Sequence, residues 1–180
     1  MATADFTLTD NEGTLLALVL RAQPITAYQI AKTYEESPVT NFNTSKGKLY
    51  PLVRRLRERG LVEAEPVAGD ARGTERLVCT DVGKRAVKQW VLDIKQGHLL
   101  LEDPLRTKLQ SFDLLSRDER IGWIVEVKAQ LRAKLEALEA YGREVEVPFK
   151  DLVHDNAVSS LRSRMDWLDR TLHRVVKSAD

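Results

Sequence analysis

The spacing of apolar residues in this sequence changes at Gly60, and that change limits the folds open to the chain. Before Gly60, apolar residues recur at i, i+3, i+4 and i+7, which is the spacing of one helix face. They are Leu49, Leu52, Val53 and Leu56. After Gly60, Val62 and Ala64 alternate with glutamates, as in a strand with one buried face. The sequence therefore predicts a docked helix followed directly by a β-hairpin.

The predicted helix lies within residues 43–61, and both of its ends are marked. Asn43 or Thr44 can accept hydrogen bonds from its first open N–H groups, and Gly60 can adopt the left-handed conformation that ends a helix. Six basic residues and one acid, Glu58, lie in this stretch, in a chain of net charge +1. The basic residues are Lys46, Lys48, Arg54, Arg55, Arg57 and Arg59. Charge alone fits a solvated surface helix equally well, so the neighbouring sequence decides.

Two further helices are predicted ahead of the basic one. Thr9 and Glu12 have the spacing of a capping box, and so do Thr26 and Gln29. A proline follows each of the two helical patterns and limits its length. The helices are expected at residues 10–21 and 27–36.

The chain beyond the first alternating stretch predicts a second strand and a fourth helix. Turn-forming residues fill positions 67–74, and Leu77 and Cys79 then resume the alternation. Thr80 can cap the fourth helix, which is expected to end near Gly97. Its apolar stripe is expected at Val87, Trp90, Val91 and Ile94.

Helix, helix, basic helix, hairpin and helix is the order of a winged helix-turn-helix module. In that module the third helix lies in the DNA major groove and the hairpin reaches the adjacent backbone. Polar residues at the start of the basic helix would face base edges and phosphates, helped by the positive end of the helix dipole. The candidate DNA-binding residues are Thr26, Tyr28, Thr44, Ser45, Lys46, Lys48, Tyr50, Arg54 and Arg72.

Three stretches of this module are distinctive: AYQIAK at residues 27–32, SKGKLYPLVRRLRERGLVEAE at 45–65 and LVCTDVGKRAVKQWV at 77–91. They resemble the PadR family of bacterial transcriptional regulators. The combination of Leu-Tyr-Pro inside the basic helix with Gly-Leu-Val at the start of the hairpin carries most of the resemblance. Ala27 stands where the family commonly has glycine, and Val78 where it commonly has an aromatic residue. These departures concern a phosphate contact and the packing of the wing.

The second half of the chain has the spacing of three amphipathic helices. Asp103 and Pro104 precede a short one, a long one opens near Asp118, and the last follows Pro148. The last helix carries a coiled-coil-like seam with steps of three and four residues. The seam consists of Val158, Leu161, Met165, Leu168, Leu172 and Val175. A hairpin within one chain could bury it, whereas the family resemblance implies that these helices pair between two subunits.

Together these patterns predict a mainly α-helical chain of two domains. Residues 1–97 are expected to form a winged helix-turn-helix DNA-binding domain with a two-stranded β wing, and residues 98–180 a helical dimerisation domain. A two-fold dimer suits this function, because one recognition helix reads only a few base pairs.

Aromatic residues on the helices form the candidate input site. On apolar helix faces such residues are usually core. The family resemblance implies instead a small aromatic effector that would release the DNA. The candidate effector-binding residues are Trp90, Phe112, Trp123, His154 and Trp167.

The sequence argues against catalysis, cofactors, metals and membranes. The longest apolar run, residues 15–20, is too short to span a membrane, which indicates a cytoplasmic protein. Three dispersed histidines and a single cysteine, Cys79, give no metal-binding spacing and no disulfide framework. No glycine-rich phosphate loop or nucleophile turn is present.

The leading interpretation is a PadR-like repressor that binds double-stranded DNA at a near-palindromic operator as a homodimer. Two alternatives stay open. One is a nonspecific, architectural DNA-binding protein. The other is a winged-helix module that binds proteins rather than DNA, and the basic third helix argues against it.

Overall fold

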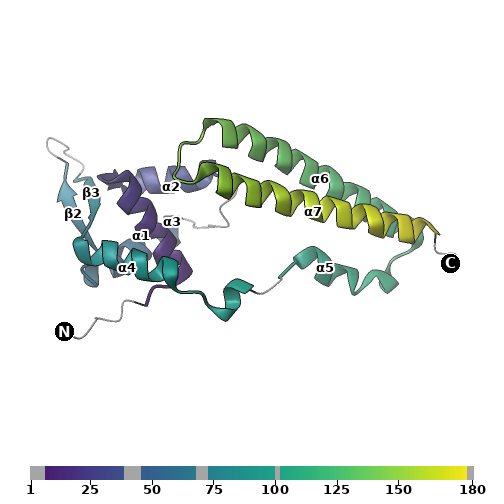
Figure 1. The fold of residues 1–180 in the computed structure, drawn as a ribbon, viewed down its shortest axis with the longest axis horizontal. Coiled ribbons are helices and arrows are strands. Elements are labelled where there is room, and N and C mark those ends of the chain that lie inside the picture. The colour runs from purple at the N-terminus through teal and green to yellow at the C-terminus, as the bar shows by residue number, and fades with distance from the viewer. Residues whose placement is uncertain (1–6, 39–45, 68–72, 100–101, 178–180) are drawn as a thin grey trace. The chain divides into compact units, whose positions relative to one another are not determined.

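The structure is a computed structural model that describes residues 7–38, 46–67, 73–99 and 102–177, without the side chains of Lys46 and Gly47. The chain divides into two compact units, Met1–Leu100 and Leu101–Asp180. Figure 1 shows the helices and strands of both. In the described part of the chain, no helix is long and apolar enough to cross a membrane.

The helices of the N-terminal unit follow the order that the sequence predicts. They are α1 (Asp10–Ala22), α2 (Ala27–Glu36), α3 (Lys46–Glu58) and α4 (Asp81–Leu92), followed by the 3-10 turn η1 (Gln96–Leu99). Both predicted capping boxes are confirmed, because Thr9 caps α1 with Glu12 and Thr26 caps α2 with Gln29. Gly60 follows α3 with a φ of 65°, which confirms its left-handed conformation.

The sheet of this unit has one strand more than the sequence predicts. The predicted wing strands are β2 (Val62–Pro66) and β3 (Glu75–Cys79), which pair antiparallel with Val62 opposite Cys79. A third strand, β1 (Ile25–Thr26), pairs with the other edge of β3 and gives the order β1-β3-β2. A strand of two residues has no alternation of its own, so the sequence offered no sign of it.

One apolar core joins these elements. The four apolar residues predicted on α3 are all buried, and the inward-facing strand residues Val62, Leu77 and Cys79 join the same cluster. The burial of each large apolar side chain contributes about 1.5–3 kcal/mol. Helix α4 approaches the hairpin closely at Gly83, where a Cβ atom would lie 2.2 Å from the backbone oxygen of Leu61. The core therefore fixes α3 with one face inward and the opposite face outward.

The predicted apolar stripe of the fourth helix is wrong in its second half. Val87 is buried and Trp90 packs against the core, but Val91 and Ile94 are 65% and 74% exposed. Helix α4 ends at Leu92, because the next residue, Asp93, leaves the helical conformation and caps it. Trp90 therefore lies in the last turn that reaches the core.

The C-terminal unit is a long helical hairpin with short elements before it. These are α5 (Pro104–Leu109) and the 3-10 turn η2 (Phe112–Leu114), and the hairpin consists of α6 (Arg117–Glu144) and α7 (Lys150–Lys177). The two long helices lie side by side in Figure 1. The six predicted seam residues of α7 pack in one cluster with side chains of α6. Val158, Leu161 and Leu168 are buried within one chain, whereas Met165, Leu172 and Val175 are half-buried there. The role of the seam between two chains stays a prediction.

Candidate nucleic-acid interface

The outward face of α3 borders a groove that also includes the start of α2 and the start of β3. Its volume is about 640 Å³. Four of the candidate DNA-binding residues line this α2–α3 groove: Thr26, Tyr28, Tyr50 and Arg54. Thr26 is the N-cap of α2, Tyr28 lies in the first turn of α2, and Tyr50 and Arg54 lie on α3, so the fold brings the four together.

The two tyrosines of the groove are open to solvent. Tyr28 is 67% exposed and Tyr50 is 58% exposed, which is unusual for large aromatic side chains. Each offers a ring face and a phenolic hydroxyl that can donate or accept a hydrogen bond. Thr26 is less free, because its hydroxyl donates to Gln29 Oε1 at 3.1 Å and accepts from the Gln29 N–H at 3.2 Å. The positive end of the α2 dipole also lies here.

The other candidate DNA-binding residues are described in part. Lys48 is exposed on the first turn of α3 and forms no ion pair with any described residue. Lys46 is the first residue of α3, but its side chain is not described. Thr44, Ser45 and Arg72 lie outside the described residues.

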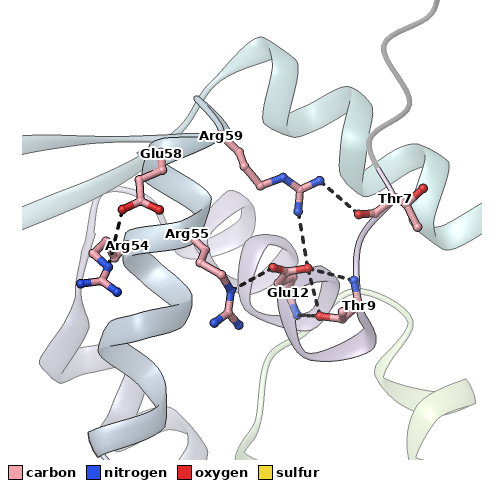
Figure 2. Close-up of polar contacts among 7 residues, drawn as sticks. All are labelled: Thr7, Thr9, Glu12, Arg54, Arg55, Glu58 and Arg59. Carbon is pink, nitrogen blue, oxygen red and sulfur yellow. Dashed lines mark hydrogen bonds and ion pairs between the residues drawn. The ribbon is translucent and has the colours of Figure 1, made fainter.

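The arginines of α3 do not form one basic outer face, which corrects the interpretation of the sequence. Within the α2–α3 groove, Arg57 Nη1 contacts Glu75 Oε2 at 2.8 Å. Arg54 Nε lies 3.6 Å from Glu58 Oε1, and both of these side chains are more than 60% exposed. Arg55 and the nearby Arg59 point the other way, toward α1 (Figure 2). Only part of the positive charge of this stretch therefore faces the groove.

Glu12 is the acid that holds Arg55 and Arg59. Its Oε1 lies 3.3 Å from Arg55 Nε, and its Oε2 lies 3.5 Å from Arg59 Nη1 and 3.0 Å from the Thr9 N–H that it caps (Figure 2). Glu12 is 6% exposed, so burial alone would raise the pKa of its carboxyl group. The hydrogen bonds from Thr9 and the two guanidinium groups outweigh burial and lower that pKa. Glu12 is therefore a buried, ionised and fully paired carboxylate.

Only one of the two roles of Glu12, the capping of α1, is visible in the sequence. The capping box is a local pattern, visible in four consecutive residues. Arg55 and Arg59 lie 43 and 47 positions away along the chain, so no periodic pattern relates them to Glu12. The acids beside the groove, Glu58 and Glu75, were likewise missed as partners of its arginines.

The five candidate effector-binding residues are distributed over both units, one in the N-terminal unit and four in the C-terminal unit. Phe112 and Trp123 pack edge to face, with ring centroids 5.1 Å apart. The ring of His154 lies against Gly142, at the bend of the α6–α7 hairpin. Trp167 borders a separate hollow of about 540 Å³ between α5 and α7. Trp90 belongs to the N-terminal unit, where it packs on Gly13 of α1.

The hollow beside Trp167 has a polar lining. Hydroxyl groups of α7 and two arginines surround it, and one of these, Arg164, contacts Asp103 at 3.1 Å. Among the described residues, no group of three or more His, Cys, Asp or Glu side chains is placed to hold a metal ion. The hollow thus offers one aromatic surface with polar and charged groups around it.

Comparisons with known proteins relate both the sequence and the fold to one family. Residues 15–89 match the transcriptional regulator PadR-like family. None of the curated proteins matches the sequence. The fold resembles that of Bacillus subtilis PadR in complex with operator DNA, with 19% identity, a TM-score of 0.78, and coverage of 93% of this chain and 99% of that chain.

Two other solved structures are similar to a comparable degree. Bacillus subtilis PadR in complex with p-coumaric acid is 17% identical, with a TM-score of 0.73 and coverage of 93% of this chain and 96% of that one. A PadR-like transcriptional regulator from Bacillus cereus is 18% identical, with a TM-score of 0.74 and coverage of 97% and 99%. At these identities the likeness shows the fold.

Proposed function

We propose that this chain represses transcription by binding operator DNA as a homodimer, because its residues 15–89 match the PadR-like family of transcriptional regulators. The observation that carries the proposal is the α2–α3 groove. It brings Tyr28 of α2 together with Tyr50 and Arg54, which lie on the face of α3 that the core leaves outward. A solved protein of the same fold is bound to operator DNA.

In this proposal α3 enters the major groove and the start of α2 lies over the backbone. The N-terminal amides of α2 favour a phosphate, because their dipoles point toward it. The hydroxyls of Tyr28 and Tyr50 can bond phosphate oxygens or base edges, and Lys48 can neutralise a phosphate. In this arrangement α2 positions the protein on the DNA backbone, and α3 reads the base sequence.

The ion pairs of the groove permit this binding at small cost. Exposed pairs such as Arg54–Glu58 contribute about 0–1 kcal/mol, so Arg54 can leave Glu58 for a phosphate. An unpaired Glu75 would repel a phosphate, but Arg57 Nη1 lies 2.8 Å from Glu75 Oε2 and offsets the charge of the carboxylate. Arg55 and Arg59 are held by Glu12 and are not expected to contact DNA.

Dimerisation supplies the length of sequence that a single α3 cannot read. Two recognition helices related by a two-fold axis read half-sites about 34 to 36 Å apart, which gives a near-palindromic operator. The C-terminal unit is the proposed dimerisation domain. The seam of α7 already packs against α6 within one chain. We therefore expect the contact between subunits to include apolar side chains that the hairpin leaves exposed, such as Leu152 and Val153.

A small aromatic effector is the proposed signal that releases the DNA. A solved protein of the same fold is bound to p-coumaric acid. In this chain the hollow between α5 and α7 has suitable chemistry, because the Trp167 ring can stack on an aromatic ring and Arg106 or Arg164 can attract a carboxylate. The packed Phe112–Trp123 pair, by contrast, fits a core role. Such a regulator acts in the cytoplasm, without catalysis.

The test is selection of bound duplexes from a random pool, followed by affinity measurements at several salt concentrations. We expect the selected duplex to bind at least about 1,000-fold more tightly than random DNA. Lys48→Ala and Arg54→Ala should weaken binding, and each lost phosphate contact should lower the salt slope by about 0.9. Lys88→Ala, an exposed position on α4, is the matched control and should change neither.

Two results would contradict this function. Equal affinity for selected and random duplexes would identify an architectural DNA-binding protein. Absence of binding to any duplex at low salt would identify a protein-interaction module.

A further inference from the structure

The segment Thr7–Gly13, which contains the first turn of α1, contacts α3 on one side. Glu12 pairs with Arg55 and Arg59, as Figure 2 shows. Arg59 Nη2 also donates a hydrogen bond to the Thr7 backbone oxygen at 3.1 Å. Three separate contacts therefore tie the C-terminal end of α3 and Arg59, the residue that follows it, to this segment.

The same segment holds the end of α4 and the residues that follow it. Asp10 Oδ1 accepts a hydrogen bond from Trp90 Nε1 at 3.2 Å and lies 3.3 Å from His98 Nε2. Lys95 Nζ donates to the Leu8 backbone oxygen at 3.1 Å. We call residues 93–99 the connector, because they lead along the chain from α4 to the C-terminal unit.

Trp90 lies directly on the backbone of α1. A Cβ atom at Gly13 would lie 2.3 Å from Trp90 Cδ2 and Cε2, so the ring occupies the space that any larger residue would need. Gly13 follows Glu12 immediately. The residues that hold α3 and those that hold Trp90 are thus neighbours in one helical turn.

The capping box makes this turn a stiff link between the two sides. The Thr9 N–H donates to Glu12 Oε2, the same atom that lies near Arg59, and the Gly13 N–H donates to the Thr9 backbone oxygen at 2.8 Å. Leu8 anchors the turn in the core at 2% exposure. A shift at Asp10 cannot leave Glu12 in place, because two residues of one capped turn move together.

His98 forms two hydrogen bonds that hold the connector in a defined position against α1. Its Nδ1 accepts a hydrogen bond from the Lys95 N–H at 3.2 Å, so the neutral ring carries its proton on Nε2 and donates it to Asp10. The carboxylate Asp10 and the cation Lys95 are the charged groups that face this ring. The connector is therefore held to α1 through defined hydrogen bonds.

We propose that the first turn of α1 couples the connector to the recognition helix, with Glu12 as the positioning residue for α3. When the connector detaches from Asp10 and Leu8, the turn moves, the hold of Glu12 on Arg55 and Arg59 loosens, and operator affinity changes. This inference rests on the proposed DNA-binding function and adds the route by which the C-terminal unit acts on it.

The test uses substitutions that touch neither α3 nor the α2–α3 groove. His98→Ala removes the contact with Asp10, and Trp90→Phe removes the indole donor while keeping a ring. Each should lower operator affinity by at least about fivefold, within the range of about 5- to 150-fold found for coupled sites. Lys88→Ala on α4 is the control and should leave affinity within twofold. His98→Ala and Trp90→Phe proteins that bind like the wild type overturn the coupling.

A double-mutant cycle distinguishes coupling from general destabilisation. Glu12→Gln and His98→Ala act through one turn, so the double variant should lose much less affinity than the product of the two single losses. Independent losses that multiply overturn the proposal. If Glu12→Gln does not fold, Arg59→Ala takes its place in the cycle, because it removes the same ion pair from the α3 side.

Hydrogen exchange without DNA separates this proposal from the proposed function. In His98→Ala, the backbone amides of residues 55–59 should exchange faster, while those of the β2–β3 ladder keep their wild-type rates. Uniform acceleration across both regions overturns the coupling. A chain that binds no operator but shows the selective acceleration refutes the DNA-binding function and keeps the coupling.

Discussion

Glu12 carries its charge inside the N-terminal unit, where 6% of its surface is exposed. A buried carboxylate is costly unless hydrogen bonds and opposite charges surround it, and Glu12 has both. Arg55 and Arg59 are themselves partly exposed, so solvent screens their attraction and the contacts from Thr9 matter as much. The buried charge of Glu12 is therefore stabilised by Thr9, Arg55 and Arg59 together.

Replacing this carboxylate should change how stability depends on pH. The pKa of Glu12 is lowered from 4.5 in the folded chain, so its contribution is complete above about pH 4.5 and is lost as the pH falls through the lowered value. Glu12→Gln should lower the free energy of unfolding at pH 7 by about 1–3 kcal/mol and show a smaller further loss on acidification. Urea unfolding at pH 7 and pH 4 measures both effects.

The control for this measurement is Glu63→Gln, the same change on the exposed side of β2. It should leave the acid dependence as it is in the wild type. A Glu12→Gln protein that loses stability on acidification as steeply as the wild type would show that the carboxylate is not the source.

At the scale of elements, local patterns were predictable and partners distant in sequence were not. The boundaries of α2, the two N-terminal capping boxes and the inward side of β2 and β3 follow from spacing within a few residues. The third strand and the pairing of the α3 arginines depend on neighbours far along the chain. For the candidate site, the spacing of apolar residues predicted which face of α3 points outward. Which of its arginines face the groove and which face α1 could be seen only in the fold.

The contact between α4 and the hairpin gives an element-scale prediction. Gly83→Ala places a Cβ atom 2.2 Å from the Leu61 backbone oxygen, so α4 must move away from the hairpin. We expect a loss of about 1–3 kcal/mol in the free energy of unfolding. Gly122→Ala in α6 is the matched control, because a Cβ atom there meets nothing within 4 Å. It should stabilise the chain by about 0.4–1 kcal/mol, and denaturant midpoints that rank the two variants the other way would refute this packing.

At the scale of the whole molecule, the in-chain burial of the α7 seam changes how dimerisation has to be tested. Deleting α7 would expose the apolar side of α6, including Ile124, Leu131 and Leu138, so a truncated protein would fail for two reasons at once. Substitutions of exposed residues keep the hairpin intact. Leu152 and Val153 at the start of α7 are 70% and 54% exposed and suit this purpose.

The variant Leu152→Lys/Val153→Lys should be monomeric, because two lysines oppose burial in a subunit contact. Loss of the second half-site should weaken operator binding by about 100-fold or more. Sedimentation velocity and operator titration measure the two effects. Val91→Lys, at a residue of the N-terminal unit that is 65% exposed, is the control and should stay dimeric. If only the Val91→Lys control dissociates, the subunit contact lies in the N-terminal unit and the proposed contact at Leu152 and Val153 is refuted.

Cys79 gives this chain a built-in chemical reporter. It is the single cysteine of the sequence, it lies on β3 in the core of the N-terminal unit, and burial raises the pKa of its thiol. A maleimide or an aromatic disulfide reagent can therefore label it only when that unit opens. The labelling rate follows the opening of one unit in the intact protein, and the C-terminal hairpin contributes no thiol to the signal.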